Sequence, residues 1–177
     1  KLVEEFSKEL SASFQISEAA ILTKSSDAIH NVFISGCGGS GIGGTIVAEL
    51  VAGEATVPIT VNKDYFIPAF VSKNTLAIIC SYSGNNEETI SAMEFASKQK
   101  AKIVCVTSGG KIAEMAKAAG YDCIFIPPGR PPRASFGYSG LQLFKILHFN
   151  GIISDAYKND LLNAIKLLDA EESDIQK

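Results

Sequence analysis

The sequence contains neither a long run of basic residues nor an apolar stretch long enough to cross a membrane. Its formal net charge is -3, so neither a nucleic acid nor an acidic membrane surface is expected as a partner. No signal-peptide pattern opens the chain, which favours a cytoplasmic protein. The first residue is Lys1 rather than methionine, and we therefore expect these residues to be part of a longer chain.

Cysteine is scarce and widely spaced. The four cysteines form no CxxC pair and no zinc-ligand pattern, so no metal site is expected. Cys80 and Cys105 lie in apolar runs, and the simplest interpretation is buried thiols in a reducing cytosol. The alternative is a redox-active or nucleophilic Cys37, which lies beside a glycine-rich loop.

The sequence does contain enough apolar material for the core of one domain, with 177 residues of which 46% are hydrophobic and 20% charged. Short runs rich in β-branched residues alternate with helical stretches, and each run is too short for a buried helix. We interpret these runs as strands at 32–35, 57–61, 76–80, 103–107 and 123–126. Strands that are apolar on both faces predict a five-stranded parallel sheet with helices on both faces, a flavodoxin-like three-layer α/β sandwich.

Helices are expected around and between the strands of a single domain covering 1–177. Residues 1–30 should form N-terminal helices, 31–153 the α/β core, and 154–177 a further helix. The N-terminal helices are predicted from two amphipathic segments, marked by Val3, Phe6 and Leu10 and then by Ile16, Ala19, Ala20 and Thr23. Within the core, helices are expected at 41–51, 90–96, 112–119 and 139–149. The link at 62–74 contains Pro68 and is expected to be irregular.

A glycine-rich string, GCGGSGIGG at 36–44, follows the first strand and opens a helix. Glycines let a backbone approach a ligand closely, and the free N–H groups at a helix start favour an anion. Gly36, Gly38 and Gly41 also match the dinucleotide fingerprint GxGxxG, and Asp64 lies near the end of the second strand, where a ribose-binding acid is expected. A nicotinamide-dependent oxidoreductase therefore stays open, as does a turn needed only for packing.

A second polar string, CSYSGNNEET at 80–89, lies where the third strand ends and a helix begins. Such a cradle of neutral donors at a helix N-terminus can hold a phosphate that stays attached to its carrier. The alternative is an ordinary helix cap with Glu87 and Glu88 in the first turn. The hydroxyl and amide donors exceed what one cap needs: Ser81, Ser83, Asn85, Asn86 and Thr89.

These strings resemble those of the sugar isomerase (SIS) domain family, and within it the bifunctional phosphoglucose/phosphomannose isomerases. The resemblance rests on the two strings above, on TSGGKIAEMA at 107–116 and on PPRASFGYS at 131–139. It implies that the sugar phosphate is bound by Gly39, Ser40, Ser81 and Ser83. Asn86 stands where the family usually has threonine, and an amide can still donate to a phosphate oxygen.

The resemblance implies an enzyme that interconverts glucose 6-phosphate or mannose 6-phosphate with fructose 6-phosphate. Arg133 matches the family arginine that stabilises the enediolate, whereas Arg130 is interpreted as a surface residue. In the family the general base comes from a second SIS domain that follows the first. Neither His30 nor His148 is well placed to replace it. We therefore expect the chain to bind its substrate without turning it over.

Three further expectations remain open. The helix after residue 154 carries an apolar stripe, so a homodimer or contact with the second SIS domain is expected. A complete one-domain isomerase, such as a 6-phospho-3-hexuloisomerase, is an alternative function. A non-catalytic sugar-phosphate sensor is another. None of the sugar-phosphate functions needs a cofactor.

Overall fold

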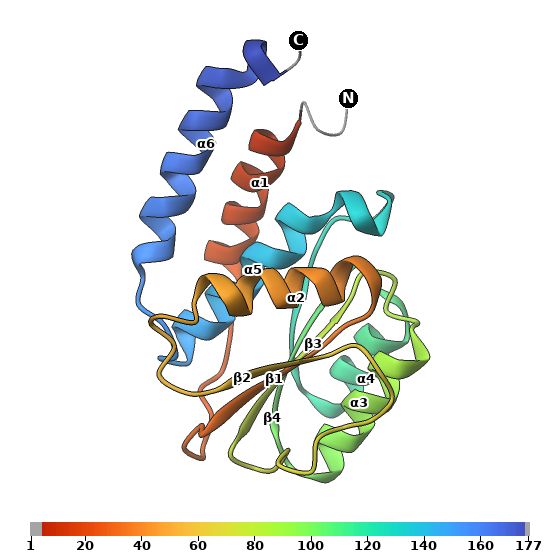
Figure 1. The fold of residues 1–177 in the computed structure, drawn as a ribbon. Coiled ribbons are helices and arrows are strands. Elements are labelled where there is room, and N and C mark those ends of the chain that lie inside the picture. Colours follow the sequence, from red (N-terminus) through yellow and green to blue (C-terminus); the bar gives the residue numbers. More distant parts are fainter. Residues whose placement is uncertain (1–4, 176–177) are drawn as a thin grey trace.

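The computed structural model describes residues 5–175, and Figure 1 shows their arrangement. A five-stranded sheet forms the centre. In chain order the elements are α1 (Phe6–Ala19), β1 (Asn31–Ser35), α2 (Gly38–Leu50), β2 (Ile59–Asn62), β3 (Thr75–Ser81), α3 (Glu87–Lys98), β4 (Lys102–Thr107), α4 (Gly110–Ala119), β5 (Asp122–Phe125), the short 3-10 helix η1 (Pro132–Ala134), α5 (Phe136–Phe149) and α6 (Ala156–Ile175).

The sheet confirms the predicted fold class. Its strand order is β2-β1-β3-β4-β5, and every neighbouring pair is parallel. This is the flavodoxin-like order, which differs from the 3-2-1-4-5-6 order of the dinucleotide-binding fold. The chain turns to one side after β1 and to the other after β3. The order therefore reverses between β1 and β3, where open α/β sheets usually bind ligands.

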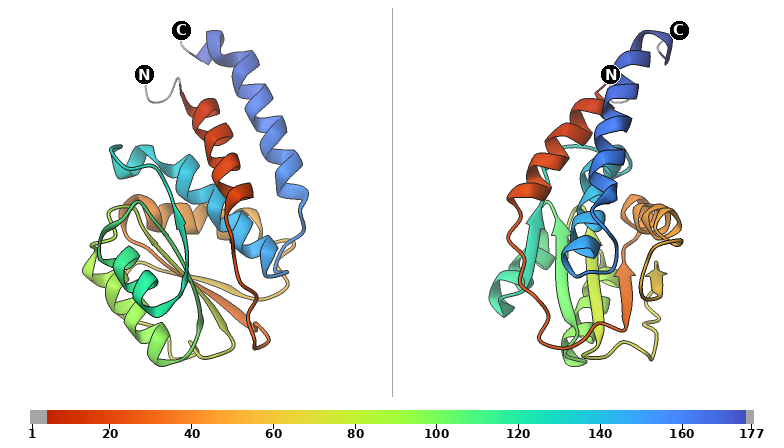
Figure 2. Two further views of the ribbon diagram at one scale, coloured as in Figure 1. Left: turned by 180° about the vertical axis from the view of Figure 1, so that it is seen from behind. Right: turned by 90° about the vertical axis from the view of Figure 1, so that its left-hand side faces the viewer.

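Helices cover both faces of the sheet, as Figure 2 shows in two further views. One face packs against α2 and α5 through a core that includes Val32, Ile34, Ile78, Val104, Val47, Leu143, Ile146 and Leu147. The other face packs against α3 and α4 through Phe33, Ala77, Ile79, Ile103, Ala92, Met93, Ile112 and Ala116. Because alternate side chains of a strand point to opposite faces, both sets must be apolar, and the strands read as continuous hydrophobic runs.

The link between β2 and β3 is irregular, as expected. Residues 63–74 contain no helix or strand, yet this segment contributes Val71 to the core beside α3. Its buried valine lets an irregular crossover cover apolar surface on the same face of the sheet as Phe33. A helix is therefore not needed at this place.

The expectation of two N-terminal helices is wrong in part. Phe6 and Leu10 belong to α1, but residues 20–30 form no second helix, and Val3 lies outside the described residues. Figure 1 shows this segment running past the sheet to the start of β1 at the opposite end. An extended chain advances more than twice as far per residue as a helix, which suits that path. The Asp122 carboxylate fixes the segment by accepting the Thr23 N–H at 2.9 Å.

Two helices project beyond the sheet. α1 and α6 lie side by side in both figures, with α1 also packed against α5. α6 is fixed at its start by the buried Tyr157, whose ring stacks on Phe144 with centroids 5.7 Å apart. The Glu18 carboxylate of α1 accepts a hydrogen bond from the Lys158 ammonium group of α6, with Oε1 and Nζ 2.8 Å apart. No described helix is long and apolar enough to span a membrane.

Candidate functional site

Two loops meet at the carboxyl edge of the sheet, where the strand order reverses. The glycine-rich loop (residues 36–40) follows β1, and the serine-rich loop (residues 81–86) follows β3. β1 and β3 are paired neighbours, with Ser35 opposite Ile79. The N-termini of α2 and α3 therefore lie at the same edge of the sheet, as the sequence predicts, and each presents a positive dipole end there. The space between the two loops is called the crevice below.

The glycine-rich loop is packed too tightly for side chains. A Cβ on Gly36 would lie 2.9 Å from the Cys80 carbonyl oxygen, and one on Gly41 only 2.3 Å from the Gly36 oxygen. α2 begins at Gly38, earlier than the pattern predicts, so Gly39 and the nearly buried Ser40 lie in its first turn. Cys37 occupies the N-cap position and makes no side-chain capping bond. The first-turn N–H groups are thus not capped by that side chain and can face an anion.

The serine-rich loop gathers its polar groups around one amide. Asn86 Oδ1 accepts hydrogen bonds from Ser81 Oγ at 2.8 Å and from Ser83 Oγ at 3.4 Å. Ser81 is buried and also accepts the Gly84 N–H at 3.1 Å, whereas Ser83 is exposed. The structure therefore brings Ser81, Ser83 and Asn86 together, with Ser81 beneath the loop and Ser83 at its surface.

Thr89 lies apart from these three residues. It belongs to the first turn of α3, is fully buried, and its hydroxyl has no hydrogen-bond partner among the described residues. Its role as a ligand stays a prediction, and among the candidate ligands it is the one least exposed to the crevice.

The third side of the site is the proline loop (residues 127–135), which runs from β5 to α5 and includes η1. A Cβ on Gly39 would lie 3.1 Å from the Pro132 oxygen and 3.4 Å from the Arg133 Cα. The proline loop is therefore in direct contact with the first turn of α2. The backbone of the exposed Arg133 thus lies beside Gly39, although the two residues are far apart in the sequence, and its catalytic role stays a prediction.

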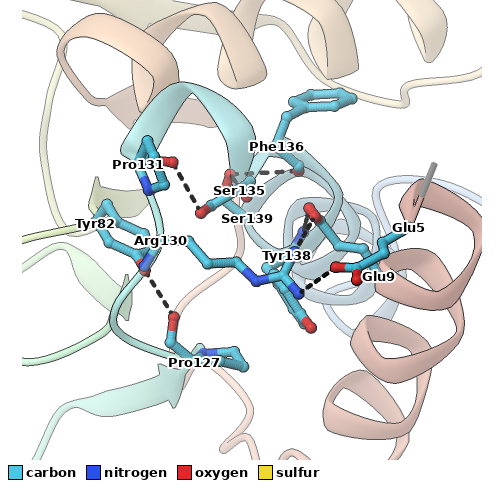
Figure 3. Close-up of polar contacts among 10 residues, drawn as sticks. All are labelled: Glu5, Glu9, Tyr82, Pro127, Arg130, Pro131, Ser135, Phe136, Tyr138 and Ser139. Atoms are coloured by element: carbon cyan, nitrogen blue, oxygen red, sulfur yellow. Dashed lines mark hydrogen bonds and ion pairs between the residues drawn. The ribbon is translucent and has the colours of Figure 1, made fainter. Parts of the chain in front are cut away.

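Tyr82 joins the serine-rich loop to the proline loop, as drawn in Figure 3. Its hydroxyl donates to the Pro127 oxygen at 2.9 Å and accepts the Arg130 N–H at 2.9 Å. Its own carbonyl accepts the Ser108 hydroxyl at 2.6 Å. The side chain and the backbone carbonyl of this one residue, which lies between the two candidate serines in the sequence, thus hold three loops in one arrangement.

The interpretation of Arg130 as a surface residue is wrong. Its guanidinium is half-buried, donates to Glu9 Oε2 at 3.1 Å and lies 3.7 Å from Glu5 Oε2. It also lies over the Tyr138 ring, 5.4 Å from the centroid (Figure 3). Sequence reasoning missed Glu9 as well, because a carboxylate within an amphipathic helix normally faces water. Nothing in the local pattern shows that α1 carries this one into the molecule.

The two histidines lie away from the glycine- and serine-rich loops, and Glu87 is already hydrogen-bonded. His30 precedes β1 at the opposite edge of the sheet, and its backbone N–H donates to the Asn74 carbonyl oxygen at 2.8 Å. His148 lies in the last turn of α5, beside the Tyr157 ring. Glu87 accepts the Tyr65 hydroxyl at 3.2 Å in the first turn of α3.

The cysteines behave as buried or protonated thiols. Burial raises the pKa of Cys80 to about 12 and that of Cys123 to about 11. Burial also raises the pKa of Cys37, and the nearby Glu88 charge adds to the effect. A raised pKa opposes formation of the thiolate that a nucleophilic or redox-active Cys37 would need. Within the described residues, no three His, Cys, Asp or Glu side chains are placed to hold a metal ion.

Known proteins with similar sequences include enzymes that are named for their action on sugar phosphates. The chain is 40% identical over 146 residues to a bifunctional phosphoglucose/phosphomannose isomerase of Caldicellulosiruptor bescii, a match that covers 82% of this chain and 43% of that protein. The corresponding enzyme of Thermoplasma acidophilum is 42% identical over 139 residues, covering 73% of this chain and 43% of its own length. The chain thus spans less than half the length of these relatives.

A solved structure shares the fold. The C-terminal domain of glucosamine-fructose-6-phosphate aminotransferase from Francisella tularensis superposes with a TM-score of 0.66 at 16% identity, covering 96% of this chain and 56% of that one. Residues 27–136 match the SIS domain family, and this segment holds all three loops of the crevice. With more than half of its residues in that match, the chain belongs to the SIS domain family.

Proposed function

We propose that this chain is the sugar-phosphate-binding part of an isomerase that interconverts glucose 6-phosphate or mannose 6-phosphate with fructose 6-phosphate. The observation that carries the proposal is the crevice between β1 and β3, where two helix N-termini, the paired serines and Arg133 come together. The relatives at about 40% identity are named for these two activities.

The phosphate would be held at the start of α3. Ser83 presents an exposed hydroxyl, and the backbone N–H groups of the first turn and the helix dipole add to it. The amide oxygen of Asn86 points toward both serines. Because this oxygen is a hydrogen-bond acceptor, it would repel a phosphate oxygen. Rotation of this amide would place its NH₂ group toward the phosphate and free both hydroxyls to donate.

The sugar would extend from the phosphate across Gly39 and Ser40 toward Arg133. Isomerisation moves a proton between C1 and C2 through an enediolate, whose oxygen becomes negatively charged. A fixed guanidinium beside that oxygen lowers the energy of the intermediate. Arg133 would serve this role, because the contact of its loop with Gly39 fixes its backbone at the crevice.

We propose that the general base comes from a second domain. Neither His30 nor His148 lies at this edge of the sheet, and the Glu88 carboxylate near Cys37 belongs to the first turn of α3, where it suits the helix dipole. A positioned base or acid is worth about 10²–10⁴ in rate. A second SIS domain would supply it, and the greater length of the relatives agrees with this proposal.

The activity is tested by an assay coupled to glucose-6-phosphate dehydrogenase, with fructose 6-phosphate as substrate. We expect binding by calorimetry and no detectable turnover by these 177 residues. Appreciable turnover would favour the complete one-domain isomerase instead. A parallel titration with NAD distinguishes the isomerase from the alternative of a nicotinamide-dependent oxidoreductase. Binding of NAD without binding of fructose 6-phosphate would contradict the proposal.

Self-association is the second part of the proposal. The expected stripe of α6 is less exposed than the pattern suggests, because Leu161, Ile165 and Leu168 are half-buried on the side toward α1. Leu162 and Leu167 are the exposed pair, at 42% and 57%. These two residues flank the half-buried stripe on opposite sides of the helix. We propose that this surface of α6 joins a second copy or the second SIS domain, since exposed apolar side chains favour association.

A further inference from the structure

One carboxylate of the molecule is buried without being part of the crevice. Glu9 lies in α1, outside the segment that matches the SIS family, and only 3% of it is exposed. Burial of an ionised carboxylate is costly unless hydrogen bonds and a counter-charge replace water. Burial raises its pKa, which the Tyr138 N–H and the Arg130 charge oppose. The Tyr138 N–H and the Arg130 guanidinium therefore replace the water that burial removes from Glu9.

Glu9 contacts the chain on both sides of Arg133. Its Oε2 accepts the Arg130 guanidinium at 3.1 Å, and its Oε1 accepts the Tyr138 N–H at 3.2 Å, as Figure 3 shows. The segment between these two contacts is the proline loop with η1 and the start of α5. A single side chain thus fixes both ends of the segment that carries Arg133.

The contact at α5 replaces an ordinary helix cap. Ser135 is the N-cap residue and makes no side-chain capping bond, so the first-turn N–H groups need another acceptor. Glu9 supplies a negative charge there, which also suits the helix dipole. A Cβ on Gly137 would lie 2.7 Å from Glu9 Oε1, so the glycine permits the close approach.

Attachment of α1 does not itself depend on Glu9. Ser13, one turn further along α1, donates its hydroxyl to the Tyr138 oxygen at 3.2 Å. Gln142 donates to Ser13 Oγ at 3.0 Å, and both residues are fully buried. The helix is therefore anchored to α5 without Glu9. What Glu9 adds is the pair of contacts that flank Arg133.

We propose that Glu9 is a positioning residue of the sugar-phosphate site: it holds the proline loop against Gly39 and thereby fixes Arg133. α1 is then part of the site although it contacts no ligand. The consequence for substrate binding rests on the proposed function, whereas the holding of the loop does not.

The first test measures the loop directly. Glu9→Gln keeps an oxygen for the Tyr138 N–H and removes the charge that pairs with Arg130. Hydrogen exchange followed by mass spectrometry should show faster exchange in residues 127–139, with the sheet unchanged. The matched control is Asp122→Asn, which disrupts a buried ion pair to Lys102 (2.8 Å) at the opposite edge of the sheet. The control should leave exchange in 127–139 as it is. Equal exchange in Glu9→Gln and the unaltered chain would overturn the proposal.

The second test measures binding of fructose 6-phosphate by calorimetry. Glu9→Gln should weaken binding about fivefold, a modest coupling between sites, and Asp122→Asn should not. In an Arg133→Met background, Glu9→Gln should cause no further loss. The same loss in both backgrounds would show that Glu9 does not act through Arg133 and would refute the proposal. If the unaltered chain binds no fructose 6-phosphate, the proposed function fails, and the exchange experiment still decides the role of Glu9.

Discussion

The two serines of the serine-rich loop should respond differently to removal of the hydroxyl. Ser83 is exposed, and its hydroxyl makes only long bonds within the loop, of 3.3 and 3.4 Å. Ser81 is buried, and its hydroxyl accepts the Gly84 N–H and donates to Asn86. Ser83→Ala therefore removes mainly the hydroxyl proposed to donate to the phosphate. Ser81→Ala also removes hydrogen bonds that hold the loop together.

The magnitudes follow from these contacts. A hydrogen bond to a charged phosphate is worth about 1.5–3 kcal/mol, so Ser83→Ala should weaken binding of fructose 6-phosphate by about ten- to 150-fold. Its free energy of unfolding should change by less than about 0.5 kcal/mol, as for an ordinary surface change. Ser81→Ala should lose affinity similarly and also lose about 0.5–1.5 kcal/mol of stability, because it removes the bonds of the hydroxyl within the loop, while the Gly84 N–H keeps the Ser81 carbonyl oxygen as an acceptor at 3.1 Å.

Calorimetric titration and urea unfolding of both variants separate the two effects. The unaltered chain is the reference for affinity, and Asp122→Asn is a destabilised reference whose change lies at the opposite edge of the sheet. Full affinity in Ser83→Ala would refute the proposed phosphate cradle. Loss of stability in Ser83→Ala equal to that in Ser81→Ala would contradict the distinction between their burial.

Three other predictions follow from single contacts. Gly84 has φ +70°, and a Cβ there would lie 1.8 Å from the Gly109 oxygen. Gly84→Ala should therefore lower the free energy of unfolding by more than about 3 kcal/mol in urea titrations. A loss of less than about 1 kcal/mol would contradict this packing. The Lys158 hydrogen bond lowers the pKa of Glu18, so the pair contributes to stability above pH 4.5, by about 0.2–1 kcal/mol for an exposed pair. This contribution is lost as the pH falls through the lowered folded-state pKa. In urea titrations Glu18→Gln should therefore destabilise less at pH 3 than at pH 7, and an equal loss at both would contradict this. Replacing Leu162 and Leu167 by Gln should shift sedimentation toward monomer, and an unchanged profile would exclude this face from self-association.

The sheet could be predicted from the sequence because its strands are buried on both faces. Runs such as 76–80 and 103–107 are continuously apolar and β-branched, and no other element of this length shows that pattern. The glycine- and serine-rich loops could be placed for the same reason, since parallel strands bring their carboxyl ends to one edge. Helix starts were less accurate: α2 begins within the glycine string, where intrinsic propensity argues against a helix.

The third side of the site depended on contacts between distant parts of the chain. Arg133 was placed by resemblance, and nothing local shows that its loop contacts Gly39. Arg130 and Glu9 could not be paired from the sequence, because α1 reaches the proline loop only through its packing on α5. The second N-terminal helix is wrong for a related reason: Ile16 and Ala19 continue α1, whereas Ala20 packs against the core from an extended segment.

The central claim is that one crevice between β1 and β3 holds the sugar phosphate. The most direct test is a titration of the ¹⁵N-labelled chain with fructose 6-phosphate, followed by backbone amide chemical shifts. We predict that the largest changes fall on 38–40 and 83–88, at the two helix starts, with smaller changes at Arg133. Changes confined to the opposite edge of the sheet, around Lys24 and Lys102, or no change at all, would contradict the account.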